Sequence, residues 1–91
     1  MYKIKYTKVA KKNIPNLKAA NLDKKTKALI EIIKATPYQN PPVYEKLVGN
    51  FQELYSRRIN RQHRLVYEVF ESESEEDRIV KIVSMWTHYE F

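Results

Sequence analysis

Two runs of alternating apolar and polar residues, separated by only three residues, constrain the fold of this chain more than any other feature. Residues 51–59 (FQELYSRRI) alternate, and residues 63–70 (HRLVYEVF) alternate again. The NRQ segment between them is short enough for a hairpin turn, because antiparallel strands connect through loops of a few residues. The sequence therefore predicts a β-hairpin over residues 51–70.

The second strand of this hairpin predicts which side of the sheet the helices cover. Successive side chains of a strand point to opposite faces. One face therefore carries Leu65, Tyr67 and Val69, and the other carries Arg64, Val66 and Glu68. An arginine-bearing face next to a lysine-rich first strand is not expected to lie under helices.

The first twenty residues predict a strand followed by a helix. Residues 2–6 (YKIKY) alternate between apolar side chains and lysines, as in a half-buried strand. Thr7 is a suitable N-cap for a helix over residues 8–20. Pro15 has no amide hydrogen and disfavours helix in the residues before it, so we expect a kink or a break there.

A second helix is expected to begin at Asp23, which can serve as its N-cap, and to end before the Thr36–Pro37 pair. Its apolar stripe is formed by Ala28, Leu29, Ile32 and Ile33. The two helices are expected to form an antiparallel pair laid on the sheet.

A proline-rich loop and an acidic turn separate the remaining elements. Residues 36–43 (TPYQNPPV) hold three of the four prolines, and loops of this kind often carry functional residues. Residues 71–77 (ESESEED) predict a solvated turn before a last strand over residues 78–86. The order β-α-α-β-β-β predicts a single α+β domain over residues 1–91, with a mainly antiparallel sheet and two helices packed on one face.

The composition excludes several classes of protein. The chain has no cysteine and only two histidines, far apart in sequence, so we expect neither a disulfide framework nor a metal site. No cofactor is expected. No stretch approaches the roughly 20 apolar residues of a membrane span, and the N-terminus lacks the apolar segment of a secretory signal. We therefore expect a cytoplasmic protein without a membrane partner.

The net charge of +6 is distributed unevenly along the chain. Residues 1–36 hold ten lysines against two acidic residues, whereas residues 71–91 hold six acidic residues against two basic ones. Clustered cations favour phosphate backbones through counterion release, which gives affinity without sequence preference. Charge alone does not distinguish such a nucleic-acid surface from an ordinary solvated, lysine-rich one.

The core YSRRINRQHRLVY (residues 55–67) and the closing THY (residues 87–89) resemble the YoeB/Txe toxins of bacterial toxin–antitoxin modules, a branch of the RelE-like superfamily. The predicted element order also agrees with that fold. The resemblance implies an endoribonuclease that enters the A site of the 30S ribosomal subunit, contacts ribosomal RNA, cleaves the mRNA there and so inhibits translation. It also implies a YefM-like antitoxin.

The resemblance assigns roles to individual residues. Glu45 falls on the family's catalytic acidic residue, and Arg64 falls on the arginine of the His-Arg-Leu-Val-Tyr run. His88 and Tyr89 fall on the terminal catalytic pair. Arg58, the second arginine of the Ser-Arg-Arg run, is then expected to contact phosphate.

Three more basic side chains are candidate RNA or phosphate contacts: Lys46, Arg57 and Arg61. The chain departs from the family pattern in two places. The family has a lysine where this chain has Val48, and Lys46 is a candidate substitute. Glu90 and Phe91 follow the usual terminal tyrosine, which puts in question any role for a terminal carboxylate.

These residues suit metal-independent cleavage of RNA, because RNA carries its own nucleophile in the 2′-OH. Glu45 is the expected general base and His88 the expected general acid, since an imidazole titrates near neutrality. Arg64 and Arg58 would stabilise the charge that develops on the phosphate. Tyr89 could orient a base or a phosphate.

Structural roles compete with several of these assignments. Without the resemblance, Glu45 reads as a helix-start residue or a surface carboxylate. Arg57 and Arg58 are expected to point to opposite faces, so that one of them is structural or faces the antitoxin. His63 falls on the Leu65 face and reads as a structural histidine, and the side chains of Met85 and Trp86 read as packing residues.

Two other classes of function stay open on the sequence. One is a non-catalytic RNA- or ribosome-binding module, which needs the basic surface but neither Glu45 nor His88. The other is a degenerate toxin that serves only as an antitoxin partner. The aromatic strands and residues 37–44 would suit either a homodimer or the docking of an antitoxin helix.

Overall fold

The fold, taken from a computed structural model, is described for residues 1–47 and 54–86. The elements in chain order are β1 (Lys3–Tyr6), α1 (Lys8–Ala19), α2 (Asp23–Ala35), β2 (Tyr44–Leu47), β3 (Leu54–Arg58), β4 (Arg64–Phe70), the short 3-10 helix η1 (Glu75–Asp77) and β5 (Ile79–Ser84). The predicted elements are therefore present within the described ranges. One strand, β2, was not predicted.

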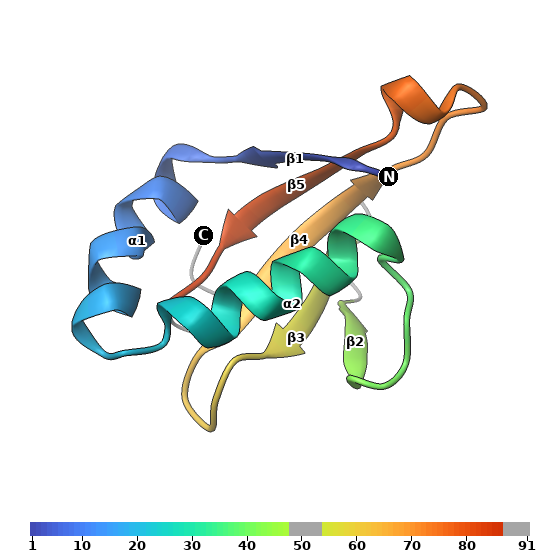
Figure 1. Cartoon of the computed structure of the whole chain (residues 1–91). Coiled ribbons are helices and arrows are strands. Elements are labelled where there is room, and N and C mark those ends of the chain that lie inside the picture. The colour runs from blue at the N-terminus through green and yellow to red at the C-terminus, as the bar shows by residue number, and fades with distance from the viewer. Residues whose placement is uncertain (48–53, 87–91) are drawn as a thin grey trace.

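The strands form one sheet in the order β1-β5-β4-β3-β2 (Figure 1). Strand β1 runs parallel to β5, with Lys3 opposite Ile79, and the other neighbouring strands are antiparallel. The sheet is thus mainly antiparallel, as predicted from the sequence. The first strand lies beside the last one at one edge of the sheet, and β5 joins it to the hairpin of β3 and β4 that the alternating runs predicted.

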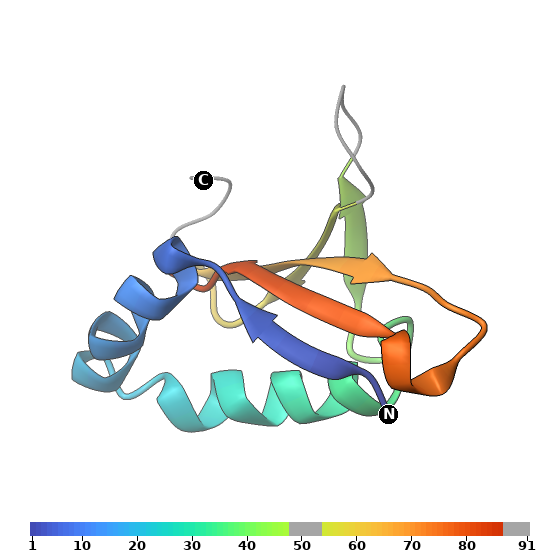
Figure 2. The ribbon, with the colours of Figure 1, turned by 90° about the horizontal axis from the view of Figure 1, so that it is seen from above.

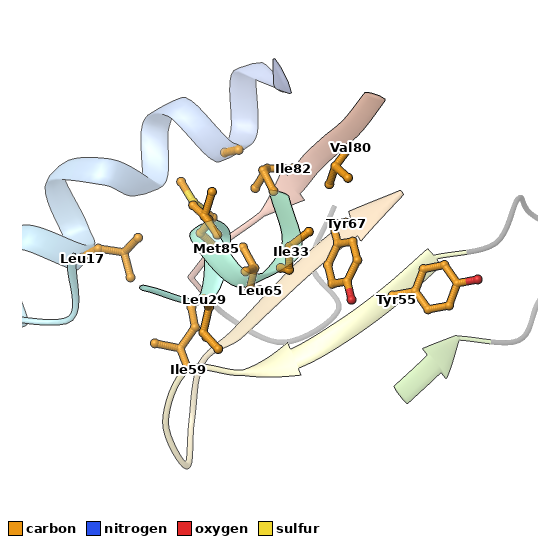
Figure 3. Packing of buried hydrophobic residues seen from close by; sticks show 12 residues of the cluster. Leu17, Leu29, Ile33, Tyr55, Ile59, Leu65, Tyr67, Val80, Ile82 and Met85 are labelled. Carbon is orange, nitrogen blue, oxygen red and sulfur yellow. The ribbon is translucent and has the colours of Figure 1, made fainter. Parts of the chain in front are cut away.

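Both helices lie on the same side of the sheet, which confirms the predicted layering (Figure 2). Helix α2 crosses that face, and α1 lies at the end of β1 and β5. The core between the layers is apolar and centres on the side chains of β4 and β5 (Figure 3). Its fully buried members include Ile33, Ile59, Leu65, Tyr67, Val80 and Ile82.

Helix α1 begins at the predicted cap, since the Thr7 hydroxyl accepts a hydrogen bond of 3.1 Å from the amide of Ala10. Of the two outcomes predicted at Pro15, a kink or a break, the break does not occur, because α1 runs from Lys8 to Ala19 as one helix. Ala10 and Leu17, on either side of the proline, are both buried in the core. Packing on both sides therefore outweighs the hydrogen bond that proline removes.

Helix α1 ends in a Schellman motif. Asn21 is in the left-handed region with φ of 58°, and its amide donates to the carbonyl of Lys18 at 3.1 Å. The amide of Leu22 donates to the carbonyl of Leu17 at 2.8 Å, and a left-handed residue with this bond pair is typical of the motif. Helix α2 follows directly.

The predicted cap and stripe of α2 need correction. Leu22, not Asp23, is the N-cap, and it makes no side-chain capping bond. Asp23 lies in the first turn, where its charge is favourable to the helix dipole. The buried residues of α2 are Thr26, Leu29, Ile30 and Ile33, whereas Ala28 is exposed. Neither helix in the described ranges has the length and apolar character that a membrane span requires.

Candidate functional site

A hollow of about 390 Å³ opens over strands β2, β3 and β4. It is lined by Pro42, Val43, Glu45, Ser56, Arg58 and Arg64. Three of the predicted site residues, Glu45, Arg58 and Arg64, therefore share one cavity although 19 positions separate the first from the last. These three side chains were predicted from the sequence as site residues, and the sheet brings them together.

The strand register explains why these side chains meet. Glu45 of β2 lies opposite Ser56 of β3, and Arg58 of β3 lies opposite Arg64 of β4. Partners in an antiparallel pair share a face of the sheet, and their neighbours in sequence point to the other face. The neighbours Tyr55 and Leu65 belong to the helix-covered core. The hollow is consequently on the face opposite α2.

The position of Arg64 is set by the turn between β3 and β4. Its Nη1 donates to the carbonyl of Asn60 at 3.0 Å and makes longer contacts with the carbonyls of Arg61 and His63. The turn itself is held by the Asn60 side chain, whose Oδ1 accepts from the amides of Gln62 and His63 at 2.9 and 2.8 Å. The turn thus holds the guanidinium of Arg64 in a fixed position at the hollow.

The electrostatics of the hollow favour an anion beside a base. Arg58 and Arg64 are cross-strand partners, and like charges placed directly opposite repel each other. A phosphate between them would relieve that repulsion through charge-assisted hydrogen bonds. Glu45 supplies a carboxylate on the same wall. This arrangement can hold a phosphodiester and accept a proton from a group next to it.

The remaining predicted catalytic residues, His88 and Tyr89, lie outside the described residues. The same holds for Val48, Glu90 and Phe91, where the chain departs from the family pattern. Their roles stay predictions from the sequence.

Arg57 requires a correction. The side chain is fully buried and donates to three main-chain carbonyls and to the Tyr67 hydroxyl. Such a buried guanidinium is not placed to contact a phosphate in solution. The expectation that Arg57 and Arg58 point to opposite faces is confirmed, because Arg58 lines the hollow.

Lys46 and Arg61 lie outside the lining of the hollow. Lys46 is exposed and pairs with Tyr55, so its side chain leaves β2 on the face opposite to that of Glu45. This geometry argues against Lys46 as a substitute for the family lysine within the hollow. Arg61 is exposed in the turn that holds Arg64, next to the hollow rather than in it.

The structural interpretation of His63 is confirmed. Its ring is buried and stacks on the indole of Trp86 with the ring centroids 4.0 Å apart. Its Nδ1 is hydrogen-bonded to the main-chain carbonyl of Trp86. Met85 is buried in the core, and the partly buried Trp86 packs against that core. Both are therefore packing residues, as expected.

Sequence reasoning missed three residues that line the hollow: Pro42, Val43 and Ser56. Strand alternation carried a signal for Ser56, which is two positions before Arg58 and so on the same face. Pro42 and Val43 belong to the proline-rich loop that was expected to carry functional residues, but no rule singled them out within it, because their position depends on the path of the loop. Within residues 1–47 and 54–86, no three His, Asp or Glu side chains come together as metal ligands.

A protein-family comparison places the sequence in a known group. Residues 16–89 match the model of the YoeB-like toxin of bacterial type II toxin–antitoxin systems. The match covers most of the chain, including the hairpin and every residue of the hollow. No curated protein matches the chain significantly.

Solved structures agree with the family match. A YoeB/ParE toxin from Agrobacterium tumefaciens is 27% identical with a TM-score of 0.82, and the alignment covers 96% of this chain and 99% of that one. The YoeB of a dimer from Staphylococcus aureus is 31% identical with a TM-score of 0.77, covering 97% and 98%.

A more distant structure shares the fold alone. YafQ of an Escherichia coli DinJ–YafQ complex is 18% identical with a TM-score of 0.76, and the alignment covers 96% of this chain and 92% of YafQ. The predicted α+β, RelE-like architecture is thereby confirmed. With its family model matched from residue 16 to residue 89, the chain belongs to the YoeB-like toxins of bacterial type II toxin–antitoxin systems.

Proposed function

We propose that this toxin is a metal-independent endoribonuclease that cleaves mRNA in the A site of the ribosome and so inhibits translation. The observation that supports the proposal most is the shared hollow of Glu45, Arg58 and Arg64. A carboxylate beside two guanidiniums is what cleavage of a phosphodiester by its own 2′-OH requires, because the reaction needs a base and a stabiliser of developing negative charge.

In the proposed mechanism, Glu45 accepts the proton of the 2′-OH while the 2′-oxygen forms a bond to phosphorus. Arg58 and Arg64 stabilise the pentavalent, doubly charged phosphorane. His88 donates a proton to the 5′-oxygen as the phosphorus–oxygen bond breaks. The products are a 2′,3′-cyclic phosphate, which can be hydrolysed to a 3′-phosphate, and a 5′-OH end. Tyr89 orients the substrate, and Arg61 contacts phosphate at the edge of the hollow.

The partners proposed for this chain are an antitoxin, a second copy and the ribosome. A YoeB–YefM complex from Staphylococcus aureus contains a chain 32% identical to this one, and a related structure from that organism is a YoeB dimer. A YefM-like antitoxin and a homodimer are therefore the protein partners we infer. The lysine-rich first third of the chain would face ribosomal RNA in the cytoplasm.

The proposed function is tested by primer extension on an mRNA translated in vitro with the purified chain, with and without ribosomes. The native chain is expected to cut only ribosome-bound mRNA. Glu45→Gln and His88→Ala are each expected to slow cleavage by roughly 10²- to 10⁴-fold, the contribution of general acid–base groups. Glu73→Gln, an exposed carboxylate of the acidic turn, is the matched control and should cleave like the native chain.

Growth after induction gives the second readout. The native chain should arrest growth, and either active-site change should restore it while the circular dichroism spectrum is retained. If all variants arrest growth equally and none cleaves mRNA, the chain acts as a ribosome-binding module instead.

A further inference from the structure

The buried side chain of Arg57 has no part in the proposed mechanism, yet it donates four hydrogen bonds next to the hollow, three to main-chain carbonyls and one to a hydroxyl. We propose that Arg57 is a positioning residue for the reaction: it fixes the proline-rich loop that forms one wall of the hollow and leads into the strand of Glu45. The inference rests on the proposed function, because it assigns a second residue to the same site.

The contacts of Arg57 converge on the loop. Its two terminal nitrogens donate to the carbonyls of Pro42 at 2.5 Å, Gln39 at 2.8 Å and Pro37 at 3.0 Å. Its Nε donates to the hydroxyl of Tyr67 at 3.1 Å. One rigid, planar group therefore holds carbonyls at the beginning, middle and end of the loop.

The Tyr67 hydroxyl completes the same network from β4. It accepts from Arg57 and donates to the carbonyl of Pro37 at 2.8 Å. Burial of its ring raises the pKa of Tyr67 above the ordinary value, and the nearby guanidinium of Arg57 offsets only part of that rise. The phenol thus connects the loop to β4, in which Leu65, Val66 and Tyr67 are fully buried.

The loop positions the reactive part of the hollow. Pro42, whose carbonyl Arg57 binds, lines the hollow together with Val43, and Glu45 follows three residues later. Arg57 also lies opposite Tyr44 in the β2–β3 pair, with its guanidinium carbon 5.0 Å from the Tyr44 ring centroid. Arg57 therefore contacts the chain at two of the three residues that directly precede Glu45.

Packing alone does not explain an arginine at this position. Burying a charge costs free energy, and an apolar side chain of similar volume is often as stabilising or more so. The acceptors of Arg57 in the described residues are neutral carbonyls, a hydroxyl and two tyrosine rings. An apolar residue cannot supply several hydrogen-bond donors in one rigid plane. The distinctive contribution of the guanidinium is therefore to fix the positions of the loop carbonyls that it binds.

The first test is the kinetics of Arg57→Lys, which keeps the charge and removes the fork. With rates normalised to the folded fraction, we expect kcat for ribosome-bound mRNA to fall on the order of 100-fold, because a shift of about 1 Å in a catalytic group has that effect. KM should stay within about threefold, since Arg58 and Arg64 still bind the phosphate. The matched control is Arg78→Lys, because Arg78 also holds a loop through a carbonyl, that of Ser72, but is not part of the hollow.

The second test does not depend on RNA cleavage. Amide hydrogen exchange, measured by NMR, should become faster in β2 of Arg57→Lys and stay unchanged in β5. If Arg57→Lys does not fold, Tyr67→Phe replaces it, because that change removes one member of the network and retains the guanidinium. Tyr67→Phe is expected to lower kcat at least several-fold, which is a smaller decrease than that expected for Arg57→Lys. It should also make amide exchange in β2 faster.

The outcomes separate the two proposals. If the native chain does not cleave mRNA, the proposed function fails, and faster exchange confined to β2 would still support the positioning of the loop. An unchanged kcat with an active native chain overturns the positioning role. So does exchange that is equally fast in β2 and β5, since that result describes a residue important only for global stability.

Discussion

At the residue scale, the pair formed by Arg58 and Arg64 is the feature that connects stability to binding. The two guanidiniums are cross-strand partners on one wall of the hollow, so their like charges repel each other. Binding sites commonly keep such local repulsion, because a bound phosphate converts it into attraction.

Replacing Arg58 tests this connection. Arg58→Gln is expected to raise the urea midpoint of unfolding slightly, because the repulsion disappears. The same change should weaken binding to RNA with a 2′-deoxy substitution at the cleavage position and reduce the slope of log K against log salt by about 1. Fluorescence anisotropy over a salt series measures the affinity and the salt slope, and urea denaturation measures the unfolding midpoint. Arg78→Gln is the control, and an unchanged salt slope for Arg58→Gln would exclude Arg58 as a phosphate contact.

Single residues were predicted well where a short-range rule applied. Strand alternation correctly separated Arg57 from Arg58 and placed His63 with the core. It did not reveal that Arg57 is hydrogen-bonded to the proline-rich loop. The bonded loop residue that is nearest in sequence, Pro42, is 15 positions away. Nor did it identify Lys46 as pointing away from the hollow, because β2 itself was not expected to be a strand.

At the element scale, the turn between the helices depends on one residue. Asn21 has a φ of 58°, where a β-carbon is unfavourable and asparagine and glycine are tolerated. The turn sets the angle at which α2 crosses the sheet, so its backbone conformation is a property of the whole helical layer.

Two substitutions at this position make a prediction. Asn21→Ala is expected to lower the free energy of unfolding by about 1 kcal/mol, because alanine resists the left-handed conformation. Asn21→Gly should leave it nearly unchanged. Urea denaturation followed by circular dichroism measures both. Asn16→Ala, an exposed asparagine within α1, is the control and should not destabilise the chain. Equal stability of the Ala and Gly variants would contradict the prediction.

The elements themselves were largely predictable, because their patterns are periodic. The exceptions depend on tertiary contacts. Residues 44–47 are too few to show a pattern, and they form a strand because β3 offers them a partner. Helix α1 continues through Pro15 because Ala10 and Leu17 pack into the core on both sides of it.

At the scale of the whole molecule, Glu71 joins three distant parts of the chain. Its carboxylate accepts hydrogen bonds from the hydroxyls of Tyr2 at 2.6 Å and Tyr38 at 2.7 Å. Tyr2 directly precedes β1, Tyr38 lies in the proline-rich loop, and Glu71 directly follows β4. The bonds from Tyr2 and Tyr38 lower the pKa of Glu71, and Arg78 adds to that effect.

This junction predicts a pH dependence. Because the folded-state pKa of Glu71 is lowered, its contribution to stability is present above the ordinary carboxyl pKa of about 4.3 and is lost as the pH falls through the folded-state value. The native chain should therefore have a higher melting temperature than Glu71→Gln at pH 7, and the difference should shrink below about pH 4. Glu76→Gln is the control. A difference that persists unchanged at low pH would contradict the role of the ionised carboxylate.

The parallel pairing of β1 with β5 has a consequence for the synthesis of this toxin. Lys3 finds its partner, Ile79, 76 positions further along the chain, so the first strand waits without a neighbour until nearly all of the described sequence has been made. Such long-range closure is slow compared with local hairpin formation. A nascent chain that has not yet reached β5 therefore has no neighbour for its first strand, and the sheet is completed only once the hairpin and β5 have both been made.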